Sequence, residues 1–413
     1  MPLTQAALGQ RIRSARERCH LTQERLGESI GLSRVAINQI ESGARAVSSL
    51  ELDRLAFAVG RDIREFFADD FTEHVADQDA LSALFRATPQ LADQGELLSA
   101  LQESMALGHQ VSQLEQMLGI DRAQLRAAIY ELPAPTGRWD AVRQGQRVAA
   151  DERQRLGLGI APIGDLADVL EGQGVRTGAV PLPENISGLT LCDPRIGVFV
   201  VANLDHAPLR RRFSYAHEYA HVLVDRNRRG TLSRSENRQE LIEVRANAFA
   251  ADFLMPEDGV EQFVRALGKG AGSRNQAWAF DGDAAIQAEQ RSSPGSQELQ
   301  LYDVARLAHH FGVSRLSALY RVKNLRLVGE ADFNRLKAQE ESGGGPAIAE
   351  FLRASEPLHG RDEREDFRRR FLGLGLEAFR RDEITKSKLF ELAAMVGVTR
   401  SSVQNTLTSV GME

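Results

Sequence analysis

Residues 217–221 read His-Glu-Tyr-Ala-His, and this short stretch limits the possible fold more than composition does. In a helix, positions i and i+4 lie on one face, so the imidazoles of His217 and His221 can bind one metal ion. Glu218, between them, can act on a water held at that metal. Apolar residues recur at helical spacing in 212–216 and 222–224, which predicts a helix with a core face.

This spacing is the pattern found in zinc metallopeptidases. The alternative is a surface helix that carries two histidines and a glutamate without a metal. A zinc site of this kind also needs a third protein ligand and an open position for water. Glu243 is a candidate because it lies on a second helical stretch, 240–254, which Met255-Pro256 ends. Small residues in that stretch allow close packing on a neighbouring helix.

Two segments resemble the ImmA/IrrE family of zinc peptidases. They are R-x-F-S-Y-A-H-E-Y-A-H-V-L-V, which begins at Arg211, and E-V-R-A-N-A-F-A-A-D-F-L-M-P at 243–256. The resemblance covers roughly residues 155–325. It implies that His217, His221 and Glu243 bind Zn²⁺ and that Glu218 is the general base.

Residues 21–43 have the spacing of a helix-turn-helix. Thr22 and Ser33 suit the starts of two short helices, and Gly31 suits the tight turn between them. The outward face of the second helix carries side chains that suit base edges in a major groove, namely Ser33, Arg34, Asn38 and Gln39. Gln23, Arg45 and the helix N-termini suit phosphates.

The segment 8–67 resembles the phage-repressor-like helix-turn-helix of the XRE (Cro/C1) type. The resemblance implies that Arg34, Val35, Asn38 and Gln39 line the recognition surface and that Gln23 lies near a phosphate. The alternative is a helical protein-interaction domain that does not bind DNA. Because the segment is only slightly basic, we expect binding to need a homodimer and to weaken with salt.

The length of 413 residues predicts about two to four domains. We expect a multidomain, mainly α protein with an all-α N-terminal helix-turn-helix, a central α+β zincin-like peptidase domain with a small sheet, and an all-α C-terminal region. Strands are predicted at 174–176, 186–191 and 197–202. The expected units are a DNA-binding domain at 1–70, a helical connector at 71–154, the peptidase domain at 155–330 and a helical interaction module at 347–413.

The composition of the chain argues against several classes of protein. Two cysteines exclude a disulfide framework and fit a reducing cytoplasm. The first residues show no signal peptide, and no run of about 18 apolar residues predicts a membrane span. A net charge of −6 argues against a uniformly basic nucleic-acid binder, but not against a local basic face.

Three further segments have weaker patterns. Glycine and serine are frequent in 268–298, which we interpret as a mobile insertion. Residues 311–322 look like a helix-turn-helix, and the peptidase resemblance assigns them to the scaffold. Residues 395–404 have some character of a recognition helix, but we interpret the C-terminal helices as an interaction or dimerisation module.

The sequence therefore predicts a DNA-binding regulatory zinc metalloendopeptidase in the cytoplasm. Its expected partners are a double-stranded DNA operator and a protein substrate that resembles a repressor or an antitoxin. The alternative is a transcriptional regulator whose zinc domain is a sensor or a structural platform without turnover. A third possibility is the antitoxin-like half of a toxin pair.

Overall fold

The computed structural model describes residues 3–19, 21–59, 61, 63–68, 95–120, 127–193, 197–228, 230–270, 274–281, 284–291, 293, 297–343, 348, 363–409 and 411. Each expected unit has some residues outside these ranges, and the longest such stretches are 71–94 of the connector and 349–362 of the C-terminal module.

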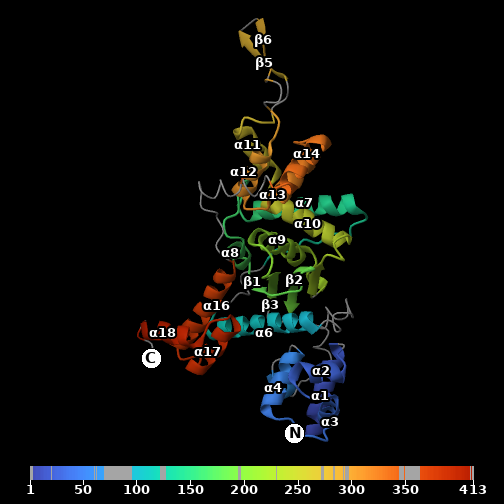
Figure 1. Ribbon diagram of the computed structural model, residues 1–413, viewed down its shortest axis with the longest axis vertical. Helices are drawn as coiled ribbons and strands as arrows, with labels where there is room; N and C mark the ends of the chain where they lie inside the picture. Colours follow the sequence, from blue (N-terminus) through green and yellow to red (C-terminus); the bar gives the residue numbers. More distant parts are fainter. Residues whose placement is uncertain are drawn as a thin grey trace.

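The chain is mainly helical, with a small four-stranded mixed sheet in its central region, as the sequence predicts. Figure 1 shows the elements stacked along the long axis, with the N-terminal helices at one end and a hairpin at the other. None of the described helices is both long enough and apolar enough to cross a membrane.

The described residues of the N-terminal domain form five short helices, which include the predicted helix-turn-helix. They are α1 (Gln5–Arg18), α2 (Gln23–Ile30), α3 (Arg34–Glu41), α4 (Ser49–Ala58) and the 3₁₀ helix η1 (Ile63–Phe66). Thr22 and Ser33 cap α2 and α3 through their side chains, and Gly31 adopts the left-handed conformation between them. Leu26 and Ile37 are fully buried, so α2 and α3 pack against each other across this turn.

The central sheet has the strand order β1-β3-β2-β4. Its strands are β1 (Val175–Val180), β2 (Ile186–Asp193), β3 (Gly197–Asn203) and β4 (Gly230–Arg234). β1 runs parallel to β3, whereas β2 runs antiparallel to both β3 and β4. The fourth strand was not predicted, because Gly-Thr-Leu-Ser-Arg is too short and too polar to show alternation, and its pairing with β2 is a long-range contact.

Both faces of the sheet are covered, and β3 shows why. Phe199 and Val201 belong to the core shared with α6 (Gly95–Met117) and α16 (Glu363–Arg380). Val200 and Ala202 belong to the core shared with α9 (Pro208–Val224). Successive side chains of a strand point to opposite faces, so one apolar strand contributes to both cores.

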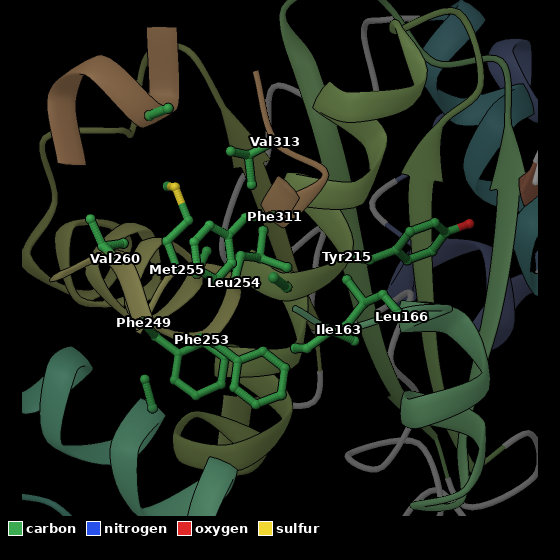
Figure 2. Close-up of a cluster of buried hydrophobic side chains, with 14 of the residues drawn as sticks. Ile163, Leu166, Tyr215, Phe249, Phe253, Leu254, Met255, Val260, Phe311 and Val313 are labelled. Carbon is green, nitrogen blue, oxygen red and sulfur yellow. The ribbon is translucent and has the colours of Figure 1, made fainter. Parts of the chain in front are cut away.

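The core on the α9 side continues into α10 (Leu241–Leu254), α11 (Glu257–Ala266) and α12 (Leu301–Phe311). Figure 2 shows part of this cluster, including the stacked rings of Phe249 and Phe253, whose centroids are 5.0 Å apart. Met255 and Phe311 pack beside them. The helix α10 ends at Leu254, before Met255-Pro256, as the sequence predicts.

The helix α7 (Arg138–Arg155) packs along α10, although it lies in the expected connector. Gly145 and Ala149 of α7 are buried, and so are Ala246 and Ala250 of α10. We therefore propose that the central domain begins before residue 155 and includes α7. A helix here agrees with the expected helical connector, but the sequence did not indicate its packing on α10, because its apolar stripe is narrow.

After α11 the chain forms β5 (Arg274–Asp281) and β6 (Ala284–Arg291). The helix α12 follows these strands, and α13 (Arg315–Asn324) and α14 (Glu330–Glu341) follow α12. The two strands pair as an antiparallel hairpin within 268–298, the segment interpreted as a mobile insertion, and the sequence did not predict these strands. Alanine and glutamine, which have low strand propensity, dominate the second strand, so its signal is weak. The C-terminal region continues with α16, α17 (Lys386–Met395) and α18 (Arg400–Ser409), and is all-α as expected.

The crossing of α7 and α10 gives a first testable prediction. A Cβ on Gly145 would lie 2.3 Å from the carbonyl oxygen of Arg245 and 2.8 Å from the amide nitrogen of Phe249. Gly145→Ala must push the helices apart, and we expect it to lower the free energy of unfolding by about 1–3 kcal/mol. Chemical denaturation measures this loss.

The matched control is Gly137→Ala at the start of α7, because a Cβ there would have no described atom within 4 Å. We expect this control to unfold like the unmodified chain. Equal unfolding midpoints for the two variants would contradict the close approach at Gly145.

Candidate functional site

The helix α9 carries the pentapeptide and is buried on almost every side. It begins with Pro208 at its first turn, where a missing N–H costs nothing. Two arginines secure its start, because Arg211 donates to the carbonyl of His206 (2.8 Å) and Arg212 donates to that of Gly164 (2.8 Å). The sheet covers one side of α9 and α10 covers the other, which holds its side chains in fixed positions.

Three side chains of α9 and α10 converge on one point. His217 Nε2 lies 3.1 Å from Glu243 Oε2, and His221 Nε2 lies 3.6 Å from Glu243 Oε1. The two Nε2 atoms are 3.3 Å apart. A tetrahedral zinc ion with ligands at 2.0–2.1 Å would separate its ligand atoms by about 3.3–3.4 Å. The donor set and its spacing therefore fit such an ion, and among the described residues this is the group found to be capable of holding a metal.

The other nitrogen of each imidazole contacts an oxygen acceptor. His217 Nδ1 lies 3.0 Å from Asn247 Oδ1, and His221 Nδ1 lies 2.9 Å from Asp225 Oδ2. An acceptor at Nδ1 favours the tautomer with its proton there, which leaves the lone pair on Nε2. Both lone pairs then face the Glu243 carboxylate, an arrangement that suits a cation between them.

Asp225 connects this site to a longer chain of polar contacts. Its second oxygen accepts from Arg245 Nη2 at 2.6 Å, and Arg245 Nη1 donates to Gln144 Oε1 of α7 at 3.2 Å. Burial opposes ionisation of Asp225, but the hydrogen bond from His221 and the charges beside it outweigh burial, so its pKa lies below the usual range. An ionised Asp225 holds His221 in one orientation.

Glu218 is fully buried against the sheet. The hydroxyl of Thr190 on β2 donates to Glu218 Oε2 at 2.8 Å. Gly188 on the same strand leaves room for this side chain, because a Cβ there would lie 3.1 Å from Glu218 Oε1. Burial raises the pKa of Glu218, whereas the nearby imidazoles lower it by a smaller amount. A raised pKa suits a carboxyl group that accepts and returns a proton.

The contact between Asp225 and His221 gives a second prediction. Asp225→Asn keeps the size of the side chain but removes the charge that orients the imidazole. We expect the affinity for Zn²⁺ to fall about 10- to 100-fold, as measured by competition with a chromophoric chelator. Glu236→Gln, at an exposed carboxylate of the same domain, is the control and should bind Zn²⁺ unchanged. Equal affinities in the two variants would show that Asp225 does not support the site.

The second set of expected site residues lies on α3. Arg34, Val35, Asn38 and Gln39 are all exposed on this helix, and Val35 is 64% exposed despite its apolar side chain. An exposed valine beside amides and an arginine suits contact with thymine methyls and base edges. Ser33 uses its hydroxyl to cap the helix by accepting from the Ala36 amide at 3.2 Å.

The two residues expected near phosphates make contacts within the domain. Gln23 Nε2 donates to Glu41 Oε2 at 2.8 Å and lies 3.3 Å from Asn38 Oδ1, so it supports α3 from the side. Arg45 pairs with Glu51 and remains 36% exposed. Glu41 itself is buried and forms an ion pair with Arg16 at 2.6 Å.

Sequence reasoning missed four residues that support the candidate metal site: Asn247, Asp225, Arg245 and Thr190. Two of them had a detectable signal in the sequence. Asp225 follows His221 by four positions and Asn247 follows Glu243 by four, a spacing that places both members of each pair on the same side of a helix. Thr190 had none, since it comes from a strand distant in sequence.

Comparison with known families identifies two domains in the chain. A family model described as a helix-turn-helix matches residues 12–66, and one described as an IrrE N-terminal-like peptidase domain matches residues 170–279. No curated protein matches the chain. The chain therefore carries an XRE-type helix-turn-helix domain and an IrrE-like peptidase domain, and both resemblances found in the sequence are confirmed. His217, His221 and Glu243 all lie within the second match.

Proposed function

We propose that this chain is a DNA-binding regulatory zinc metalloendopeptidase that hydrolyses a peptide bond in a repressor- or antitoxin-like protein. The observation that carries the proposal is the convergence of His217 Nε2, His221 Nε2 and the Glu243 carboxylate within 3.1–3.6 Å of one another. Zn²⁺ fits this donor set, and Glu218 lies beside it on the same helix.

Each residue has one role in the proposed reaction. When bound, zinc supplies a Lewis acid that polarises the scissile carbonyl and lowers the pKa of a coordinated water. Glu218 accepts a proton from the attacking water as the new C–O bond forms, and it passes that proton to the leaving amine as the C–N bond breaks. Thr190 holds the carboxylate of Glu218 in place during both transfers.

The fusion of two domains supports the choice of substrate. A chain that binds an operator through α3 is held near other proteins bound at the same DNA, which raises its effective concentration there. We therefore propose repressors or antitoxins as substrates, with a linker of this chain as a further possibility. A homodimer would match the two half-sites that such operators usually contain.

DNA binding by α3 can be tested separately from peptidase activity. We expect Asn38→Ala combined with Gln39→Ala to lose about 1–3 kcal/mol of base discrimination for each bidentate contact removed. Selection of binding sites from random double-stranded DNA measures this loss. Asn334→Ala combined with Gln339→Ala is the control, because it removes the same two exposed side-chain types from α14. An unchanged selected sequence in the first variant would contradict DNA reading by α3.

One observation favours a second candidate function. His217 is 5% exposed, Glu243 3% and His221 1%, so the described residues enclose these side chains almost completely, whereas a peptidase needs access for its substrate. A regulator that uses the metal domain as a sensor or a structural platform, without turnover, would need no such access. Glu218→Gln separates the two candidates.

A further inference from the structure

The last two helices of the chain repeat the local plan of α2 and α3. In the first pair, Gly31 ends α2 in the left-handed conformation, with φ of 74°. In the second pair, Gly397 follows α17 with φ of 72°. Each glycine is followed by one apolar residue and then by the hydroxyl residue that precedes the next helix, Ser33 in one case and Thr399 in the other. Both turns also share a backbone hydrogen bond, from the Leu32 amide to the Gly27 carbonyl in one and from the Val398 amide to the Ala393 carbonyl in the other.

The capping contacts agree in detail. Ser33 Oγ accepts from the amide of Ala36 at 3.2 Å, and Thr399 Oγ1 accepts from the amide of Ser402 at 3.2 Å. Each hydroxyl residue is followed directly by an arginine at the first position of the helix, Arg34 or Arg400.

The correspondence extends along both helices at a constant spacing. Apolar residues match apolar residues, and an amide pair on α3 matches an amide pair on α18. The matched pairs are Leu26 with Leu392, Ile30 with Val396, Leu32 with Val398, Ile37 with Val403, Asn38 with Gln404, and Gln39 with Asn405. The same order of apolar and amide residues therefore occurs twice in one chain.

Packing keeps α18 in place while leaving its outer face open. Leu392 of α17 is 1% exposed, and Leu407 of α18 is fully buried. The helix α16 packs on α17 as the third helix of this unit. Arg400 and Asn405 are exposed, Gln404 is half-buried, and among the described residues of α18 no large apolar side chain is exposed.

The charge of α17 and α18 suits a polyanion. Residues 384–411 contain three basic residues and one acidic residue, whereas the whole chain has a net charge of −6. Lys388 pairs with the one acid, Glu391, at 2.7 Å. The guanidinium carbon of Arg400 lies 4.6 Å from the centroid of the Phe390 ring, which positions this cation at the start of α18. A polar, basic face with few apolar atoms fits DNA better than a second copy of the chain.

The two units lie at the same end of the molecule. Figure 1 shows α16 and α17 beside the end of α6, with α18 farther out, on the side where the N-terminal domain also lies. A cavity of about 400 Å³ separates them, lined by Phe57 of α4, Met105 of α6 and Met395 of α17, among others. We propose that α17 and α18 form a second helix-turn-helix that binds double-stranded DNA, with Arg400, Gln404 and Asn405 facing base edges.

The test uses the full chain and random double-stranded DNA as the probe. Sites selected by the unmodified chain should contain two short sequence motifs. Gln404→Ala combined with Asn405→Ala should erase one motif and weaken binding to the composite site about tenfold or more. Asn38→Ala combined with Gln39→Ala should erase the other motif and retain the motif that depends on Gln404 and Asn405. The control pair Asn334→Ala and Gln339→Ala should retain both.

Several outcomes would overturn the proposal. One is a single selected motif that the Gln404 and Asn405 changes leave intact, with affinity within twofold of the control. Another is a change in oligomeric state by sedimentation with no change in the motifs, which would identify α18 as a contact between two copies. Thermal unfolding shows whether the chain with Gln404→Ala and Asn405→Ala is folded. Arg400→Ala, also checked for folding, is a second variant that should lose the same motif. Because the readout is DNA sequence, failure here is distinguishable from failure of the peptidase.

Discussion

Replacing His217 with alanine is expected to remove the metal from the chain. The unmodified protein should contain close to one zinc per chain by elemental analysis, and His217→Ala should contain almost none. The reason is geometric, because His221 Nε2 and the Glu243 carboxylate alone leave an open site that water can enter. A metal that binds only the folded state adds about 2.7–4.1 kcal/mol of stability at 100 to 1,000 times its dissociation constant, so we also expect a lower unfolding temperature.

His206→Ala is the matched control for this prediction. His206 lies in the same domain, but its ring contacts the Glu184 carbonyl at 3.2 Å and the Asn203 amide at 3.4 Å instead of the metal site. It should keep its zinc. A full complement of zinc in His217→Ala would show that the three converging side chains do not hold the ion.

Replacing Glu218 with glutamine is expected to stop peptide hydrolysis while the metal stays. Glutamine has nearly the same size, and its carbonyl oxygen can still accept the hydrogen bond from Thr190, but the amide cannot accept the proton of the attacking water. General acid–base catalysis typically contributes 10²- to 10⁴-fold, so we expect a loss of rate of that order. The measurement is the rate at which substrate is cleaved, at equal zinc content.

Glu236→Gln is the control here too, because it removes one exposed carboxylate from the same domain. It should cleave at the unmodified rate. If Glu218→Gln instead keeps its zinc and its full effect on transcription from a reporter, the metal domain acts as a sensor or a platform and not as an enzyme.

The local features of the fold could be predicted from the sequence. The helices that carry His217 and Glu243 follow from short-range periodicity and from the proline that ends the second helix, and the N-terminal helices follow from Thr22, Gly31 and Ser33. All of these signals lie within a few residues of the element that they define, so one sequence is sufficient to detect them.

The remaining features depend on contacts between distant segments. The sequence predicts one core face for α9. In the structure the sheet covers one side of this helix and α10 covers the other, so Glu218 is fully buried. The contact of Thr190 with Glu218 joins a strand to a helix 28 residues away. β4 and the approach of α7 at Gly145 also depend on partners that no local pattern indicates.

The most direct test of the peptidase proposal is a comparison of intact masses. The zinc-loaded chain and its Glu218→Gln variant would be incubated, in parallel, with purified helix-turn-helix repressors and antitoxins from the same cell and with no added protein. We expect one substrate, or the chain itself, to split into two fragments whose masses sum to the parent plus one water, and only when the unmodified chain is present. Identical masses in both incubations for every protein tested, at one zinc per chain, would contradict it.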